Sequence, residues 1–378
     1  AKEDRADKLK EWTKSPLDSK KFPELLKSES DDRLALGAAM RRSRNLLMAS
    51  LISRDLEAKA ELHEVITAIS HFADFVIQTH LAELNAEMTA QHGQPIGEES
   101  HTVQELIVLG MGKLGGYELN VSSDIDLIFC YNEDGETNAT GEQRQLSNHE
   151  YFSRLGKKLI AAISEITEDG FVFRVDMRLR PYGSEGPLAC SLAMLGEYYQ
   201  NQGREWERYA WIKGRVIAGP EKEVADLLRP FVFRKYLDYG AFASMRDLKV
   251  QIQRDVNKRD MHDNIKLGRG GIREVEFIAQ VFQLIRGGQD TSLQIRPTLS
   301  VLNLLKDKKL LPESTVLSLS EAYVFLRDLE HRLQYQEDQQ TQTLPVNDEA
   351  KQKLALAMNC TDWGVLHAKI EAHRQVVD

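Results

Sequence analysis

The chain has 378 residues, which is longer than a typical single domain, so two or three domains are expected. Its formal net charge of −9 argues against a protein that coats nucleic acid, because binding to phosphates normally needs a net basic face. No apolar run reaches the roughly 18 residues of a membrane span, and no signal peptide is visible. The start without methionine indicates processing or trimming. The three cysteines lie far apart without CxxC spacing, which predicts reduced, buried thiols and a cytoplasmic protein.

Residues 1–98 predict a helical N-terminal region. Apolar residues recur at spacings of three and four through Leu56–Met88, which is the stripe of an amphipathic helix. A second helical pattern spans Asp31–Leu51, and Ser53–Asp55 can break the chain between the two helices and cap the second one. The stretch Gln91–Gly97 contains glycine and proline and is predicted to be a linker.

Strands are predicted between residues 99 and 218. Apolar runs indicate strands at about 105–110 and 124–131, and an alternating run indicates a third at 170–178. A helix is predicted near Asn148–Ile166, and the acidic loop Asn132–Gly141 is assigned no chemistry. In the third strand, alternation places Val172, Arg174 and Asp176 on one face. Phe171, Phe173 and Val175 take the other face. This pattern indicates the rim of a site rather than a core.

From about Ser191 the pattern is helical, and residues 219–378 are expected to form a helical C-terminal domain. Short breaks at glycine or proline divide the predicted helices. The fold class is therefore α+β and mostly α, with a small mixed sheet flanked by helical N-terminal and C-terminal regions. The helices predicted after Ser191 are Glu205–Ile217, Phe242–Arg259, Gly271–Arg286, Glu321–Tyr335 and Asp348–Met358.

The second predicted strand opens with Asp124 and Asp126, which flank one apolar residue. Because side chains alternate along a strand, both carboxylates are expected on one face, where they repel each other unless a cation lies between them. Mg²⁺ suits such a site, and Asp176 on a neighbouring strand would complete a clamp for two metal ions. An Asp-x-Asp at a strand start can also be solvated turn chemistry. The glycine run before it and Asp176 after it favour a metal site with catalytic carboxylates.

A glycine-rich turn, Gly110–Gly116, precedes this strand. Glycines let backbone N–H groups approach an anion that side chains would block. The run is not a P-loop, because no Gly-Lys-Ser/Thr follows, and it fits GxGxxG only loosely. A tight strand connection without a ligand is the alternative, and the serine hydroxyls after it could simply cap the turn. The candidate ligand-binding residues here are Gly110, Gly112, Lys113, Ser122 and Ser123.

A second candidate anion site lies at Gly270–Gly271, where a helix is predicted to begin. Arg273 and Glu274 fall in its first turn, and the helix is apolar on nearly all sides, which predicts a buried helix whose charged start faces a cleft. The alternative is an acidic first turn that the helix dipole stabilises.

The segments GMGKLGGYELNVSSDIDLIF and FVFRVDMRLRPYGSEGPL resemble the nucleotidyltransferase superfamily that includes DNA polymerase beta. Together with WERYAWIKGRVIAG and NIKLGRGGIREVEFIAQVFQLIRGG, they closely resemble the glutamine synthetase adenylyltransferase and adenylyl-removing enzyme family over residues 103–344. That family has two homologous halves, one removing AMP from glutamine synthetase and one attaching it. The single Asp-x-Asp motif implies one half, and NVSSDIDL, GGIREVEF and the helical region ahead resemble the N-terminal, de-adenylylating half.

The resemblance implies a catalytic domain at residues 99–218 that cleaves adenylyl-tyrosine by phosphorolysis, with phosphate as attacking group and ADP and tyrosine as products. Asp124, Asp126 and Asp176 would hold Mg²⁺, while Lys113, Arg178 and Arg180 would steady phosphate or AMP. The implied partners are glutamine synthetase, a PII signalling protein and the missing adenylylating half of the same polypeptide. Three alternatives remain open: ATP-dependent adenylylation of the same tyrosine, a regulatory module that binds without catalysis, and a nucleic-acid polymerase, against which the net charge weighs.

Overall fold

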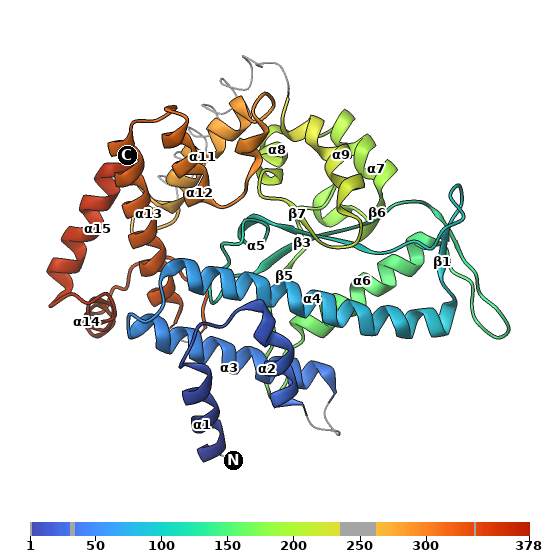
Figure 1. Ribbon diagram of the computed structural model, residues 1–378, viewed down its shortest axis with the longest axis horizontal. Coiled ribbons are helices and arrows are strands. Elements are labelled where there is room, and N and C mark those ends of the chain that lie inside the picture. Colours follow the sequence, from blue (N-terminus) through green and yellow to red (C-terminus); the bar gives the residue numbers. More distant parts are fainter. Residues whose placement is uncertain (1, 31–34, 235–261, 336–337) are drawn as a thin grey trace. The chain divides into compact units, whose positions relative to one another are not determined.

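A computed structural model describes residues 2–30, 35–234, 262–335 and 338–378 (Figure 1). These residues divide into two compact units. The first unit comprises residues 1–60, 64–119 and 123–232, and the second comprises residues 61–63, 120–122 and 233–378. Helices dominate and the strands are few and short, which confirms the α+β fold class. The domain boundaries at residues 98 and 218 stay predictions.

The first unit begins with α1 (Lys2–Trp12), α2 (Phe22–Glu29), α3 (Leu36–Leu56) and α4 (Leu62–His92). Helices α1 and α2 pack against α3, and the ring of Phe22 meets that of Phe72 on α4 at 5.4 Å. The predicted break at residues 53–55 is wrong, because Arg54 and Asp55 are buried within α3. Arg54 Nε donates to Glu64 Oε1 at 2.8 Å. The chain instead turns at residues 57–61, and the second helix starts at Leu62.

A mixed sheet forms the centre of the first unit, in the order β5-β3-β2-β7, with β6 also paired to β3. Strand β2 is antiparallel to both neighbours, and β5 and β6 are parallel to β3. The first two predicted strands are confirmed. Six of the seven residues of β3 are buried, as an apolar strand covered on both faces should be. The strands are β2 (Ile107–Met111), β3 (Ile125–Tyr131), β5 (Val175–Asp176), β6 (Ala189–Ser191) and β7 (Arg215–Ala218).

The third predicted strand, at 170–178, is reduced to the two residues of β5. Val172 and Phe173 are both buried, so the expected alternation of faces fails there. Their backbone N–H groups donate to the carbonyl of Ile163 at 3.0 and 3.2 Å instead of to a strand partner. The chain thus leaves the preceding helix and reaches the sheet only at Val175.

Two further expectations need correction. The predicted linker and the predicted loop 132–141 contribute strands β1 (Pro95–Gly97) and β4 (Gly135–Thr137), which pair antiparallel. Of the predicted helix over 205–217, only α8 (Glu205–Trp211) is helical. The last residues of the predicted range, from Arg215, belong to β7. The alternating exposure of β7, with Arg215 and Ile217 buried, fits an edge strand paired with β2.

Helices cover this sheet. The predicted helix near 148–166 is confirmed as α6 (Asn148–Ser164), and Ser147 caps its N-terminus by accepting a hydrogen bond from the N–H of Glu150. In Figure 1, α4 runs past the sheet and reaches α6. Gln78 of α4 donates to the carbonyl of Ile217, and Thr89 hydrogen-bonds the hydroxyl of Tyr151. The remaining helices are α5 (Gly112–Gly115), α7 (Leu192–Asn201) and α9 (Glu221–Val232).

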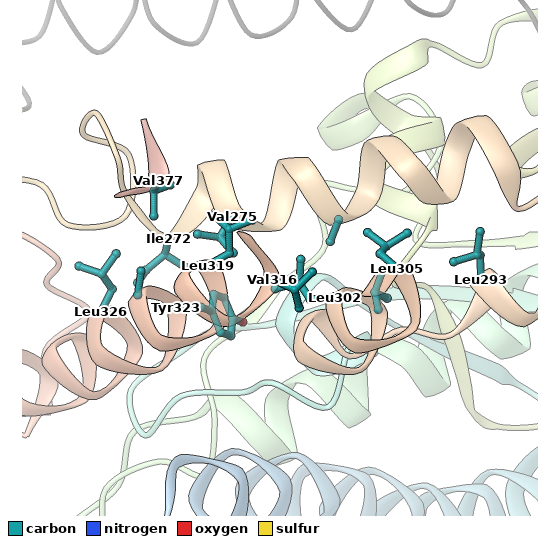
Figure 2. Close-up of a cluster of buried hydrophobic side chains, with 13 residues drawn as sticks. Ile272, Val275, Leu293, Leu302, Leu305, Val316, Leu319, Tyr323, Leu326 and Val377 are labelled. Carbon is teal, nitrogen blue, oxygen red and sulfur yellow. The ribbon is translucent and has the colours of Figure 1, made fainter. Parts of the chain in front are cut away.

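The described part of the second unit is mostly helical. One core cluster joins α11, α12 and α13 to Val377 of α15, with Tyr323 packed among aliphatic side chains (Figure 2). The predicted helices at 271–286, 321–335 and 348–358 are confirmed, whereas the one at 242–259 lies outside the described residues. The helices are α11 (Ile272–Arg286), α12 (Thr298–Asp307), α13 (Glu313–Gln334), α14 (Asp348–Ala357) and α15 (Trp363–Val377).

Two predictions concern the cysteines and membrane spans. Cys130, Cys190 and Cys360 are buried free thiols, as predicted. Among the described residues, none of the helices combines the length and the apolar character that crossing a bilayer requires.

Candidate active site

The sheet brings two of the predicted carboxylates side by side. Asp126 is the second residue of β3, and its Cα partner on the parallel strand β5 is Asp176. On its other side Asp126 is opposite Met111, the last residue of β2. Both aspartates are half-buried, whereas Ile125 is fully buried, so the carboxylates lie on the open side of the strands. The predicted adjacency of residues 126 and 176, fifty positions apart in the chain, is thus present in the backbone register.

Asp124 stands just before β3 and is paired with an arginine. Its Oδ1 accepts a hydrogen bond from Arg174 Nε at 2.7 Å, and both side chains are about one-third exposed. The backbone reinforces this pairing, because the N–H of Ile125 donates to the carbonyl of Arg174 at 2.9 Å. The Arg174 guanidinium also lies over the ring of Phe171, with 5.4 Å between its Cζ and the ring centroid. Asp124 is therefore held by the segment that leads into β5.

Asp176 has a guanidinium partner of its own. Arg178 Nε and Nη2 donate to Asp176 Oδ2 at 2.8 and 2.5 Å, and the backbone N–H of Arg178 donates to Oδ1 at 2.8 Å. The hydrogen bond from Arg178 is the largest cause that lowers the pKa of Asp176. Asp176 in turn raises the pKa of Arg178, and Asp126 and Asp124 add to that rise. One guanidinium, 81% exposed, thus lies in the field of all three carboxylates.

The residues fit Mg²⁺ by chemistry. Three carboxylates on or beside adjacent strands supply the oxygen ligands that this ion prefers, and two of them already bind a cationic side chain. Within the described ranges, no group of three or more His, Cys, Asp or Glu side chains is arranged so that it could hold a metal ion. The donor types suit magnesium, whereas the described carboxylates are not gathered around a point that an ion could occupy, and binding of the ion by Asp124, Asp126 and Asp176 stays a prediction.

The glycine run forms a helical turn directly after β2. Gly112 has a φ of +55°, and a Cβ built there would lie 2.8 Å from Asp126 Oδ2, so this glycine lets the turn close against the carboxylate. At Gly115 a Cβ would lie 2.0 Å from the carbonyl oxygen of Lys213. Gly110 lies inside β2, where a Cβ would meet Ile217 at 2.7 Å. Of the predicted glycines, Gly112 is the one beside a catalytic candidate.

Two buried ion pairs hold this turn in place. Lys213 Nζ donates to Glu118 Oε2 at 2.6 Å, with both side chains less than one-tenth exposed. Arg215 Nη2 donates to Asp74 Oδ1 at 2.6 Å and to the carbonyl of Leu114 at 3.2 Å. Burial raises the pKa of Asp74, and Arg215 partly offsets the rise. The turn is thus fixed from β7 and from α4.

The other predicted ligand residues are more dispersed. Lys113 is half-buried in α5, next to Gly112, and Ser123 is buried directly before Asp124. Arg180 donates to the carbonyls of Met177, Ser184 and Gly186 and so braces the loop after β5. The remaining three lie in the second unit. Ser122 Oγ donates to the carbonyl of Asp338 at 2.7 Å, while Arg273 and Glu274 are half-buried at the start of α11.

Comparison with known proteins identifies the family of this chain. The family model described as glutamate-ammonia ligase adenylyltransferase matches residues 1–229, more than half of the chain. The chain belongs to this family. A second model, described as GlnD PII-uridylyltransferase, matches residues 246–378.

Several curated relatives are named bifunctional glutamine synthetase adenylyltransferase/adenylyl-removing enzyme. The relative from Chromobacterium violaceum is 57% identical over 90% of this chain, the one from Ralstonia nicotianae 51% over 95%, and the one from Burkholderia mallei 46% over 99%. These alignments cover 38%, 40% and 42% of the respective relatives. The chain therefore spans about two-fifths of the length of these adenylyltransferase relatives.

The strand period placed Arg174 on one face with Asp176, and the structure pairs it with Asp124. Two other basic residues around this adenylyltransferase-family site are absent from the predicted set: Lys213 and Arg215. Lys213 and Arg215 give no local signal, because their acidic partners are 95 and 141 residues away in the chain.

Proposed function

We propose that this chain removes AMP from an adenylylated tyrosine of glutamine synthetase by phosphorolysis, and so regulates nitrogen assimilation. An oxygen of inorganic phosphate forms a bond to the AMP phosphorus, and the bond from that phosphorus to the tyrosine oxygen breaks. The tyrosine oxygen takes up a proton, and the released nucleotide is ADP. The observation that carries the proposal is the register of Asp126 with Asp176, with Asp124 beside them.

Each residue of the site has a part in this reaction. Asp124, Asp126 and Asp176 would hold Mg²⁺, which neutralises charge at the transferred phosphorus when bound. Arg178, the most exposed of the site's cations, can turn its two-pronged guanidinium from Asp176 towards phosphate, which Lys cannot bind in the same bidentate way. Lys113 lies one residue from Gly112, and we assign it to the same anion. No general base is needed, because phosphate is already an anion.

The direction of the reaction rests on motifs. NVSSDIDL and GGIREVEF resemble the de-adenylylating half of the family, and the chain carries a single Asp-x-Asp. The relatives' names combine both activities, and this chain covers about two-fifths of their length. Glutamine synthetase is therefore the proposed protein substrate. A PII protein is a proposed regulator, in keeping with the match of residues 246–378 to a family named for PII uridylylation.

A paired assay with purified glutamine synthetase and Mg²⁺ tests the proposal. One tube holds the adenylylated enzyme with phosphate, and the other holds the unmodified enzyme with ATP. We expect ADP release and loss of AMP in the first tube only, and neither when the metal is chelated. Incorporation of AMP in the second tube would reverse the direction. Silence in both tubes with retained binding to glutamine synthetase would favour a regulatory module.

A further inference from the structure

Arg174 holds Asp124 and is itself placed by an aromatic ring. Its Nε donates to Asp124 Oδ1 at 2.7 Å, and its Cζ lies 5.4 Å from the centroid of Phe171. The buried Arg44 of α3 lies over the same ring, with its Cζ 5.1 Å from the centroid. A guanidinium over an aromatic face is attracted by the ring and is only weakly hydrated. Phe171 thus keeps Arg174 beside the carboxylates, and all four residues belong to the first unit.

Two arginines flank Asp176 along the chain, Arg174 two residues before it and Arg178 two residues after it. Each guanidinium is bound to a different aspartate of the site, Arg174 to Asp124 and Arg178 to Asp176. The side chains of Arg174 and Asp124 are 35% and 29% exposed, so small solutes can reach their contact. The proposed metal ligands therefore share the open side of the sheet with two cationic side chains.

A guanidinium bound to a carboxylate competes with a metal ion for it, because two cations at one oxygen repel each other. The pairings turn Asp124 and Asp176 towards different arginines, and among the described residues no three His, Cys, Asp or Glu side chains are arranged to hold an ion. A metal ion that takes Asp124 therefore displaces Arg174 or approaches against its charge. A displaced guanidinium carries five N–H donors, and inorganic phosphate is the anion that the proposed reaction brings to it.

We propose that Arg174 binds the attacking phosphate, and that its guanidinium exchanges Asp124 for phosphate when Asp124 takes a metal ion. The exchange makes metal ion and phosphate bind cooperatively, because each favours the position of Arg174 that admits the other. The carbonyl of Arg174 accepts from the N–H of Ile125 at 2.9 Å, so the side chain can turn while its backbone stays in place. This inference rests on the proposed function for its kinetic consequence, whereas the coupled binding of metal ion and phosphate needs no turnover.

The alternative role for Arg174 is to orient Asp124. An arginine that only oriented this carboxylate would strengthen metal binding, as the hydrogen-bonding partners of ligating carboxylates do. Exchange predicts the opposite sign. Removing the guanidinium should strengthen metal binding in the absence of phosphate, because a competing cation is gone. The direction of one measured change therefore separates the two roles.

Two variants and one matched control test the inference in the full chain. Arg174→Met removes the guanidinium and keeps an unbranched side chain, and Arg174→Lys keeps the charge without the fork. Arg42→Met is the control, because Arg42 Nε also donates to an aspartate oxygen, Asp169 Oδ1 at 3.1 Å, and its side chain is similarly exposed at 34%. The dissociation constant for Mn²⁺ is measured by electron paramagnetic resonance with and without inorganic phosphate. Phosphorolysis kinetics and thermal unfolding are measured for each variant.

We expect the unaltered chain to bind Mn²⁺ more tightly when phosphate is present. Without phosphate, Arg174→Met should bind Mn²⁺ about fivefold more tightly than the unaltered chain, as the loss of a partly exposed ion pair allows, and phosphate should bring it no further gain. Its KM for phosphate should rise about tenfold, while KM for adenylylated glutamine synthetase stays unchanged. Arg174→Lys should fall between Arg174→Met and the unaltered chain, and Arg42→Met should match the unaltered chain.

Weaker Mn²⁺ binding by Arg174→Met in the absence of phosphate would overturn the inference in favour of orientation. A gain from phosphate that survives in this variant would also overturn it, as would a rise of KM confined to adenylylated glutamine synthetase. Failure of the proposed function alone looks different. The unaltered chain would then show no phosphorolysis, while its Mn²⁺ affinity would still rise with phosphate and Arg174→Met would still lose that rise.

Discussion

Asp126 and Asp176 occupy paired positions on the parallel strands β3 and β5, and a guanidinium is already bound to Asp176. The pairing makes the two carboxylates one electrostatic unit, because each lowers the free energy of a cation held by the other. Arg178 is that cation in this structure.

Asp126→Asn should abolish phosphorolysis while leaving the fold intact. Asparagine keeps the shape of the side chain but removes the charge that neutralises a bound metal ion, and the loss should reach about 100-fold or more in kcat. Steady-state ADP release and far-ultraviolet circular dichroism are the measurements. Full turnover in a correctly folded Asp126→Asn protein would remove this residue from the metal site.

Gly112→Ala should reduce activity more than stability. The new Cβ would lie 2.8 Å from Asp126 Oδ2 and must push the carboxylate aside, at a positive φ that also costs about 1 kcal/mol. Gly141→Ala is the matched control, because Gly141 has a similar φ of +62° and nothing within 4 Å of its added Cβ. Chemical denaturation and kcat are compared. If the two variants had the same kcat, the contact between Gly112 and Asp126 would be irrelevant to catalysis.

Arg215→Met should destabilise the first unit. It leaves Asp74 inside the protein without its guanidinium partner and removes the side-chain hydrogen bond to the carbonyl of Leu114, so the free energy of unfolding should fall by about 3 kcal/mol. Without Arg215, burial dominates and the pKa of Asp74 should rise further.

The double variant Arg215→Met/Asp74→Leu provides the control for this prediction. It removes the stranded carboxylate and should recover part of the lost stability in urea denaturation. If the losses of unfolding free energy caused by Arg215→Met and by Asp74→Leu alone simply add in the double variant, the two residues are not coupled.

His80 should make the protein sensitive to mild acid. Burial, with help from Arg41, lowers the pKa of His80 to about 4, whereas the unfolded chain has an ordinary value of 6.5. The unfolded state then binds more protons between these two values, so stability falls as the pH drops from about 6.5 towards 4, by about 3 kcal/mol in total. Denaturation midpoints measured across this range should show the slope.

His80→Phe should flatten that slope, because it removes the titrating group and keeps an apolar ring in a buried position. His149→Gln, at an exposed position, is the control and should leave the slope unchanged. An unaltered slope in His80→Phe would assign the acid sensitivity to other groups.

Strong local patterns made β2, β3 and the carboxylate pair predictable. The first apolar run ends at Gly110 and the second follows Asp124, and Asp176 stands in a strand-like stretch with arginines around it. Pairing over long distances was not predictable. The segment of β7 continues the helical pattern of α8 and becomes a strand only because β2 offers a partner for residues 215–218. In the same way, β1 is a strand only because β4 pairs with it across a gap of about forty residues.

The site residues follow the same division. Asp124 and Asp126 were predicted from their spacing of two residues. Arg174 was predicted from the alternation of faces along a strand, which it shares with Asp176. Lys213 and Arg215 have no such signal, because their partners Glu118 and Asp74 are 95 and 141 residues away. A network assembled by tertiary contacts leaves no local signature in composition or periodicity.

The second unit consists of three separate stretches of the chain, and this limits where the chain can be cut into fragments that fold. A cut after Val232 would follow the two family models, which match either side of it. A C-terminal fragment made by this cut would contain α13 but not Asn120. Arg327 of α13 would then lose Asn120 Oδ1, which accepts a hydrogen bond from Arg327 Nη2. A recombinant C-terminal piece would therefore lack one of the hydrogen-bond acceptors of a fully buried arginine. Studies of the second unit should retain the chain from residue 61 onward.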